Sequence, residues 1–221
     1  AEYFEIPHSS VRVITEYMGG GFGSKFGPGV EGISAARLAR MARAPVKLML
    51  SRKEEHLCVG NRPSAIMKVK IGAKKDGTLT AFHSTSYGTG GVGNAGLFPL
   101  PYVFKVPNYK AEMKSVHINA GSSRAMRAPG HPQAAFAMDL AMDELAETLG
   151  MDPLELRRRN DSRQNEIRLK QYDIGAERIG WHRRNSVAGS GSGPLKRGIG
   201  MGCGLWGGGG GKNTFAEVSI H

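Results

Sequence analysis

The glycine-rich stretch GGGFGSKFGPG at residues 19–29 has the composition that points most directly to chemistry. Glycine is favoured where the backbone adopts a positive φ or where a second body comes close. A glycine-rich turn that leads into a helix N-terminus presents free backbone N–H groups, and such groups bind phosphate and other anions. The stretch therefore predicts either a loop whose backbone donors meet an anionic group or a plain tight turn.

The known nucleotide-binding fingerprints do not fit this loop. A P-loop requires G-x-x-x-x-G-K-[ST], but here the lysine follows Ser24 and precedes Phe26. The dinucleotide pattern G-x-G-x-x-G fits Gly19, Gly21 and Gly27 only if its spacing is broken. Both nucleotide interpretations are therefore disfavoured.

The elements around the loop are predicted from hydrophobic periodicity. The runs at 11–18 and 46–51 alternate and favour strands, and residues 31–44 between them favour an amphipathic helix. Strand, glycine loop, helix and strand form a βαβ-like unit. Two alternating runs joined by a Lys-Asp-Gly turn at 65–91 predict a β-hairpin, and 111–119 predicts a further strand.

The second half of the chain carries two predicted helices. Residues 132–149 have a proline in the first turn and a glycine after the last residue, which are typical helix boundaries. The apolar side of this helix is formed by three large residues, Phe136, Leu140 and Leu145. A shorter helix at 153–160 follows, with Asp152 as its N-cap.

The composition restricts the classes of partner. The 221 residues carry a formal net charge of +11, which favours anionic partners. Aromatic residues are sparse in the most basic region, 157–185, so we expect no nucleic-acid partner there but a solvated surface or a subunit contact. The two cysteines, Cys58 and Cys203, form no metal-binding or disulfide pattern. We expect no membrane span and, without a visible signal peptide, a cytoplasmic location.

A second stretch, SSRAMRAPGHPQAAFAMD at 122–139, places Arg-Ala-Pro-Gly directly before the long helix. Together with GGGFGSK it resembles the molybdenum-binding large subunit of the molybdenum hydroxylases, the xanthine dehydrogenase and aldehyde oxidase family. Three more stretches fit this resemblance in the same order: LSRKEEHLCVGNRPS at 50–64, AMDELAETLGMDPLELRRRN at 141–160 and RGIGMGCGLW at 197–206.

The resemblance implies a molybdenum–molybdopterin cofactor, with its cytosine dinucleotide form left open. The glycine loop is expected to lie against this cofactor near the metal, and a second loop is expected to meet it from another side. Backbone N–H donors suit the oxygens of such an anionic group, so no side chain is expected to ligate the metal. The expected cofactor contacts are Gly21, Phe22, Gly23, Ala125, Met126 and Arg127.

The resemblance also implies residues on the substrate side. Arg62 falls where purine oxidisers place an arginine that meets substrate, although a surface or ion-paired arginine is the alternative. Phe26 stands where those enzymes carry a glutamate, which favours aldehydes or N-heterocyclic aromatics over xanthine. Pro129, Met126 and Met201 lie near positions where purine oxidisers use phenylalanine, and core packing is the alternative for both methionines.

The implied reaction is hydroxylation with water as the oxygen source. The family's general base is a glutamate in a Gly-Val-Gly-Glu stretch that this sequence lacks, and Glu217 is a poor substitute. We therefore expect no catalytic residue in this chain and a base from a partner segment. The implied partners are the remaining part of the molybdenum subunit, an iron–sulfur subunit, an FAD subunit and a small-molecule substrate. The alternative function is a non-catalytic split or truncated assembly module without cofactor.

The expected fold class is α+β, with mixed β-sheets and flanking helices in two lobes of a larger molybdopterin-binding subunit. The first lobe covers residues 1–120 and the second begins within 121–221. The polar, basic stretch 161–197 is expected to be a linker or excursion. The glycine-dense stretch 195–211 predicts a strand or loop, and 213–221 alternates like a strand. Both chain ends resemble cut points within a larger assembly.

Overall fold

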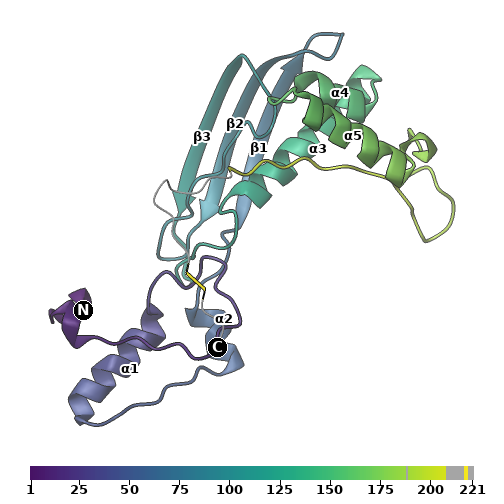
Figure 1. Cartoon of the computed structure of the whole chain (residues 1–221). Helices are drawn as coiled ribbons and strands as arrows, with labels where there is room; N and C mark the ends of the chain where they lie inside the picture. The colour runs from purple at the N-terminus through teal and green to yellow at the C-terminus, as the bar shows by residue number, and fades with distance from the viewer. Residues whose placement is uncertain (188, 208–216, 219–221) are drawn as a thin grey trace. The chain divides into compact units, whose positions relative to one another are not determined.

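The computed structural model describes residues 1–187, 189–207 and 217–218, and Figure 1 labels its helices and strands. The chain forms two compact units. Unit 1 comprises residues 1–61 and 124–127, and unit 2 comprises residues 62–123 together with the described residues from 128 onward. In the described part of the chain, no helix is both long and apolar enough to cross a membrane.

Unit 1 contains two helices, α1 (Gly29–Ala42) and α2 (Arg52–Cys58), and two short 3-10 helices at Glu2–Phe4 and His8–Ser10. Helix α2 begins with a capping box, in which Ser51 N–H donates to the Glu54 carboxylate at 2.7 Å and Glu54 N–H donates to Ser51 Oγ at 3.3 Å. No residue of this unit is buried. Local hydrogen bonds and loop contacts, rather than a packed core, therefore shape unit 1.

The two strands predicted in unit 1, at 11–18 and 46–51, are not formed. A strand needs a neighbour for its backbone N–H and C=O groups, and among the described residues neither segment has one. Most of their apolar side chains stay exposed, with Val13 at 85% and Met49 at 85%. The predicted helix between them is present as α1, so the βαβ-like prediction was correct for the helix alone.

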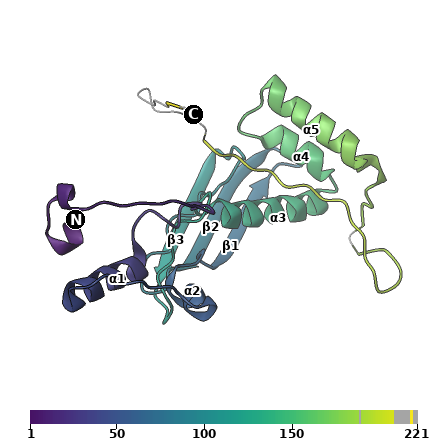
Figure 2. The ribbon, with the colours of Figure 1, turned by 60° about the horizontal axis from the view of Figure 1, so that its bottom comes forward.

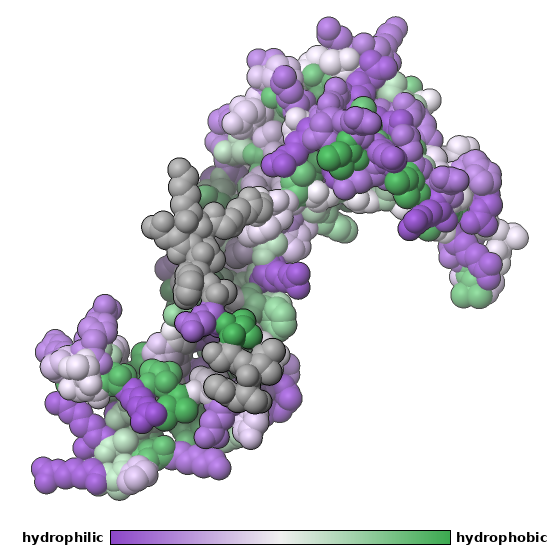
Figure 3. Space-filling view, viewed as in Figure 1, coloured by the Kyte–Doolittle hydropathy of each residue, from purple (hydrophilic) through white to green (hydrophobic). Residues whose placement is uncertain are grey.

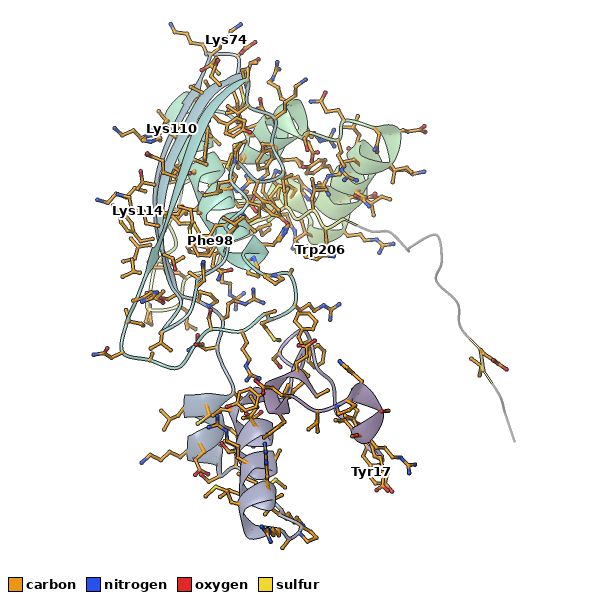
Figure 4. The ribbon with its side chains drawn as sticks, turned by 90° about the vertical axis from the view of Figure 1, so that its left-hand side faces the viewer. Tyr17, Lys74, Phe98, Lys110, Lys114 and Trp206 are labelled. Atoms are coloured by element: carbon orange, nitrogen blue, oxygen red, sulfur yellow. The ribbon has the colours of Figure 1, made fainter. Side chains whose placement is uncertain are left out.

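Unit 2 is built on a three-stranded mixed sheet. Strands β1 (Ala65–Ala73) and β2 (Leu79–Thr89) form the predicted antiparallel hairpin, and β3 (Asn108–Val116) lies parallel to β2. Figure 4 shows Lys110 and Lys114 on the face of the sheet away from the helices, and Phe98 on the helix side. The sheet therefore has one polar face and one face that contributes to the core of unit 2.

Helix α3 (His131–Leu149) packs along β1 on that inner face, as Figure 2 shows. Its predicted boundaries are confirmed, but its predicted apolar side is largely wrong. Phe136 and Leu140 are 74% and 48% exposed. The buried stripe instead follows i, i+4 spacing through small and flexible residues: Ala134, Met138, Met142 and Ala146. The two alanines allow the helix to approach the core closely, and the two flexible methionines fill the space between them.

Truncating a side chain on the buried side of α3 is expected to destabilise unit 2 more than truncating one on its exposed side. Met138→Ala should lower the free energy of unfolding of unit 2 by about 3 kcal/mol, because Met138 is fully buried and the change leaves a cavity. Phe136→Ala removes more atoms but should cost less than about 1 kcal/mol, because the ring is mostly exposed. Denaturant unfolding of both variants checks the ranking, and a larger loss for Phe136→Ala would contradict it.

Two further helices follow, α4 (Pro153–Asn160) and α5 (Glu166–Ile179). The predicted N-cap of α4 is confirmed, because Asp152 Oδ1 accepts from Leu154 N–H at 2.7 Å. Helix α5 lies within the stretch predicted as a linker or excursion, so that interpretation was wrong for 166–179. Tyr172 is the one buried residue of α5, which leaves little hydrophobic periodicity to detect. Figure 3 shows mostly hydrophilic side chains over α4 and α5.

A fully buried arginine joins helix α4 to helix α3. Arg157 on α4 donates from Nε to Asp139 Oδ1 at 3.1 Å and from Nη1 to Asp143 Oδ1 at 2.7 Å, and both carboxylates lie on α3. Asp139 Oδ2 also accepts from Cys203 N–H at 2.9 Å.

The segment that follows Cys203 is fixed by Tyr102. Tyr102 Oη donates to the carbonyl oxygen of Leu205 at 2.5 Å and accepts from the N–H of Leu205 at 2.9 Å. The 203–205 segment is therefore held against α3 at Cys203 and against Tyr102 at Leu205. Most of 213–221, the predicted terminal strand, lies outside the described residues.

A second buried carboxylate, Asp161, follows α4. Its Oδ2 accepts from Tyr172 Oη at 2.6 Å and from Arg168 Nε at 2.8 Å, and its Oδ1 accepts from Arg163 N–H at 2.8 Å. Burial alone would raise the pKa of Asp161, but these hydrogen bonds outweigh it and lower the pKa below the ordinary value. The ionised form is therefore the one that the fold stabilises.

The lowered pKa of Asp161 predicts an acid-dependent stability. A carboxyl whose folded pKa lies below its unfolded pKa stabilises the fold above the unfolded value, and this contribution is lost as the pH falls through the folded value. The difference in unfolding free energy between the wild type and Asp161→Asn should therefore shrink as the pH falls below about 5 and the carboxyl becomes protonated. Denaturant titrations at several pH values measure it, and a difference independent of pH would refute the assignment.

Candidate cofactor-binding site

The glycine loop in unit 1 forms a tight turn with an unusual backbone. Ser24 N–H and Ser24 Oγ both donate to the carbonyl oxygen of Gly21, at 3.0 and 2.9 Å. Gly20 and Gly23 have φ values of +128° and +99°, and Phe22 between them has φ +54°. A positive φ is uncommon at a phenylalanine, and such strain concentrates at ligand-binding loops. The loop conformation thus requires glycine at two positions and tolerates strain at a third.

The second predicted loop lies directly against the first within unit 1. Arg127 N–H donates to the carbonyl oxygen of Phe22 at 2.7 Å. A Cβ placed on Gly23 would lie 3.3 Å from Ala125 Cβ and 3.3 Å from its carbonyl oxygen, so the two backbones approach as closely as glycine allows. The six residues predicted to contact a cofactor therefore lie on two loops that touch.

Both loops present backbone donors. Within the described part of the chain, the N–H groups of Phe22, Gly23 and Ala125 have no hydrogen-bond acceptor. Phe22 is exposed and the other two residues are half-buried, so an external ligand can reach this region. Adjacent unpaired N–H donors fit the oxygens of an anionic group. A molybdopterin cofactor, with its metal-bound oxygens and phosphate, has the matching chemistry.

Arg62 lies in unit 2. Its Nη1 donates to the carbonyl oxygen of Ala128 at 3.3 Å, which places it one residue along the chain from Pro129. Arg62 also lines a pocket of about 850 Å³ between β1 and α3. Gln133 on α3 donates to the carbonyl oxygen of Pro63 at 2.8 Å and holds the segment that carries Arg62. Arg62 and Pro129 thus occupy one neighbourhood.

The other two predicted substrate residues, Met201 and Phe26, are not among the residues that line the pocket of Arg62. Met201 packs against the core of unit 2 and lines a different pocket of about 300 Å³, beside Tyr172 and Trp181. Phe26 belongs to unit 1 and is 86% exposed. The structure therefore places Met201 apart from the pocket of Arg62, and the substrate roles of all four residues stay predictions.

Arg124 is a residue of this site that the sequence analysis missed. It directly precedes Ala125, and its Nη1 donates to the carbonyl oxygen of Ser24 at 3.2 Å. The only signal in the sequence was a basic residue at the start of the second loop. Periodicity and motif spacing do not predict a contact between residues 100 positions apart.

Comparison with known proteins identifies the family. The family of the molybdopterin cofactor-binding domain matches residues 1–161. The chain is 31% identical over 202 residues to the aldehyde oxidoreductase molybdenum-binding subunit PaoC of Escherichia coli K12, covering 86% of this chain and 28% of that protein. It is 36% identical over 162 residues to the nicotinate dehydrogenase large molybdopterin subunit of Eubacterium barkeri, covering 69% and 37%. The chain therefore belongs to the molybdopterin cofactor-binding domain family of the molybdenum hydroxylases, as the resemblance predicted.

Solved structures agree with this assignment. The aldehyde oxidoreductase from Desulfovibrio gigas matches with a TM-score of 0.63 and 30% identity, over 76% of this chain and 21% of that one. The CO dehydrogenase from Oligotropha carboxidovorans matches with a TM-score of 0.67 at 20% identity, which shows a shared fold alone. The predicted α+β class with a mixed sheet is confirmed. The chain spans about a quarter of the length of these relatives.

Proposed function

We propose that this chain holds one side of a molybdopterin cofactor within the molybdenum subunit of a hydroxylase. The observation that carries the proposal is the contact between the two loops. Arg127 N–H bonds to Phe22, and among the described residues the N–H groups of Phe22, Gly23 and Ala125 have no acceptor, so they can bond to an external one. These donors orient an anionic cofactor, and the bound cofactor supplies the redox chemistry of a hydroxylation that takes its oxygen from water.

On the substrate side, the chain's own residues bind and orient. The guanidinium of Arg62, at the edge of an apolar pocket, suits a substrate carboxylate or a heteroatom that gains negative charge. Phe26, in place of the family's glutamate, cannot hydrogen-bond to a purine edge. We infer that the substrate is an aldehyde or an N-heterocyclic aromatic compound rather than xanthine.

The complete enzyme needs partners. The proposed general base comes from another segment of the molybdenum subunit, and the iron–sulfur clusters and FAD lie on other chains. Support for this arrangement comes from the coverage of the relatives, since the chain spans only 28% of an aldehyde oxidoreductase molybdenum-binding subunit.

Elemental analysis for molybdenum, combined with pterin fluorescence, tests the proposal on the chain purified with its native partners. We expect near-stoichiometric molybdenum and pterin, followed by turnover in a screen of aldehydes and N-heterocycles. A well-folded native complex without either component would instead identify the chain as a non-catalytic assembly module.

A further inference from the structure

Arg124 contacts two other segments of unit 1 at once, the glycine loop and residues 60–61. Its Nη1 donates to the carbonyl oxygen of Ser24 at 3.2 Å, and its backbone N–H donates to the carbonyl oxygen of Asn61 at 3.1 Å. Its aliphatic stem lies on Gly60, where an added Cβ would come within 2.5 Å of Arg124 Cγ and 2.8 Å of its Cβ. Gly60 has φ +91°, so both the conformation and the space require glycine there.

These contacts lie at the junction of the two cofactor loops. Ser24 closes the turn that presents Phe22 and Gly23, because the N–H of Ser24 donates to the carbonyl oxygen of Gly21. Arg124 directly precedes Ala125 in the second loop. Residues 124–127 therefore bond to the first loop at both of their ends. Arg124 bonds through its side chain, and Arg127 bonds through its backbone N–H.

No buried core surrounds this junction. No residue of unit 1 is buried, so a hydrophobic core does not set the spacing of the loops. A guanidinium that donates to a carbonyl makes a charge-assisted hydrogen bond, which is stronger and more directional than a neutral one. The half-buried Arg124 side chain is thus placed to hold the two loops together.

We propose that Arg124 is a positioning residue that sets the spacing of the glycine loop and the Ala125–Arg127 loop, with its stem seated on Gly60. The inference rests on the proposed function, because the loops matter for chemistry only if they hold the cofactor. Arg124 itself is not assigned a contact with the cofactor or the substrate.

Hydrogen exchange measured by mass spectrometry tests the positioning directly. The protein is the native complex after removal of its cofactor, so that the readout does not depend on loading. Arg124→Ala should accelerate exchange about fivefold or more in peptides covering 19–27 and 122–128, and leave α1 unchanged. Gly60→Ala, which displaces the Arg124 stem, should produce the same pattern. Arg40→Ala, at an exposed arginine on α1, is the matched control and should change neither peptide.

A second readout is the molybdenum content of the same variants. The molybdenum content of the complex should fall about tenfold or more in Arg124→Ala. Arg124→Lys should show the same loss, because lysine keeps the charge but lacks the guanidinium geometry. Three results would each overturn the proposal. They are unchanged exchange at 19–27 in Arg124→Ala, accelerated exchange throughout unit 1 in the same variant, and full molybdenum content in Arg124→Lys. If the wild-type complex contains no molybdenum, the proposed function fails, while the exchange result still decides whether Arg124 sets the loops.

Discussion

Replacing Arg157 by leucine should lower the free energy of unfolding of unit 2 by roughly 3–5 kcal/mol. The guanidinium is fully buried and bonds to Asp139 and Asp143, and Asp139 is mostly buried as well. Removing one partner of a buried ion pair leaves the other charge without compensation in a poorly solvated site. Among the described residues, Cys203 N–H would be the remaining hydrogen-bond donor to the Asp139 carboxylate, and any movement of this unpaired carboxylate should also loosen the 203–205 segment.

Arg159→Leu is the matched control for this change. It lies two residues away on the same helix, but its side chain is 50% exposed and its ion pair with Asp76 spans 3.9 Å. An exposed pair of this kind contributes about 0–1 kcal/mol, so the control should unfold nearly as the wild type does. Denaturant unfolding followed by tryptophan fluorescence reports on unit 2, because Trp181 and Trp206 both lie there. Equal losses in the two variants would contradict the role of burial.

Gly23→Ala should reduce the molybdenum bound by the native complex by more than about tenfold, a loss of more than about 1.4 kcal/mol in binding free energy. Alanine disfavours φ +99°, and its Cβ would press on Ala125 at 3.3 Å. Both effects move the first loop relative to the second. The donors that we assign to the cofactor would then no longer converge on one ligand.

Gly27→Ala provides the control within the same loop. An added Cβ at Gly27 meets no atom within 4 Å, and this glycine has no positive φ. Molybdenum content should therefore change by less than about twofold, within the usual effect of a surface substitution. Unchanged hydrogen exchange in peptides covering α1 and α2 confirms that unit 1 remains folded in both variants. Normal molybdenum in Gly23→Ala would remove this loop from the cofactor site.

The elements that could be predicted from the sequence are those with strong local signals. The hairpin at 65–89 carries alternation and a turn, and α3 and α4 carry caps that the structure confirms. The strands at 11–18 and 46–51 failed because alternation shows only that a segment suits pairing, and does not supply a partner. Helix α5 was missed because its surface is polar, and Tyr172 is its one buried residue.

The candidate cofactor-binding site could not be predicted from local sequence signals alone. The contact between Phe22 and Arg127 joins residues far apart in the sequence, and only the family resemblance placed the two loops at one ligand. The buried face of α3 could not be predicted from residue size, because Met138 and its small neighbours pack closely while Phe136 stays exposed. Arg124 escaped detection because its role depends on a glycine, Gly60, that only the folded chain brings beneath it.

Hydrogen exchange of the native complex, with and without its cofactor, tests the central claim most directly. If both loops hold one molybdopterin, the cofactor should slow exchange in peptides covering 19–27 and 122–130 together and leave the β1–β2 hairpin unchanged. Protection that is absent from both loops, or confined to one of them, would contradict a shared site.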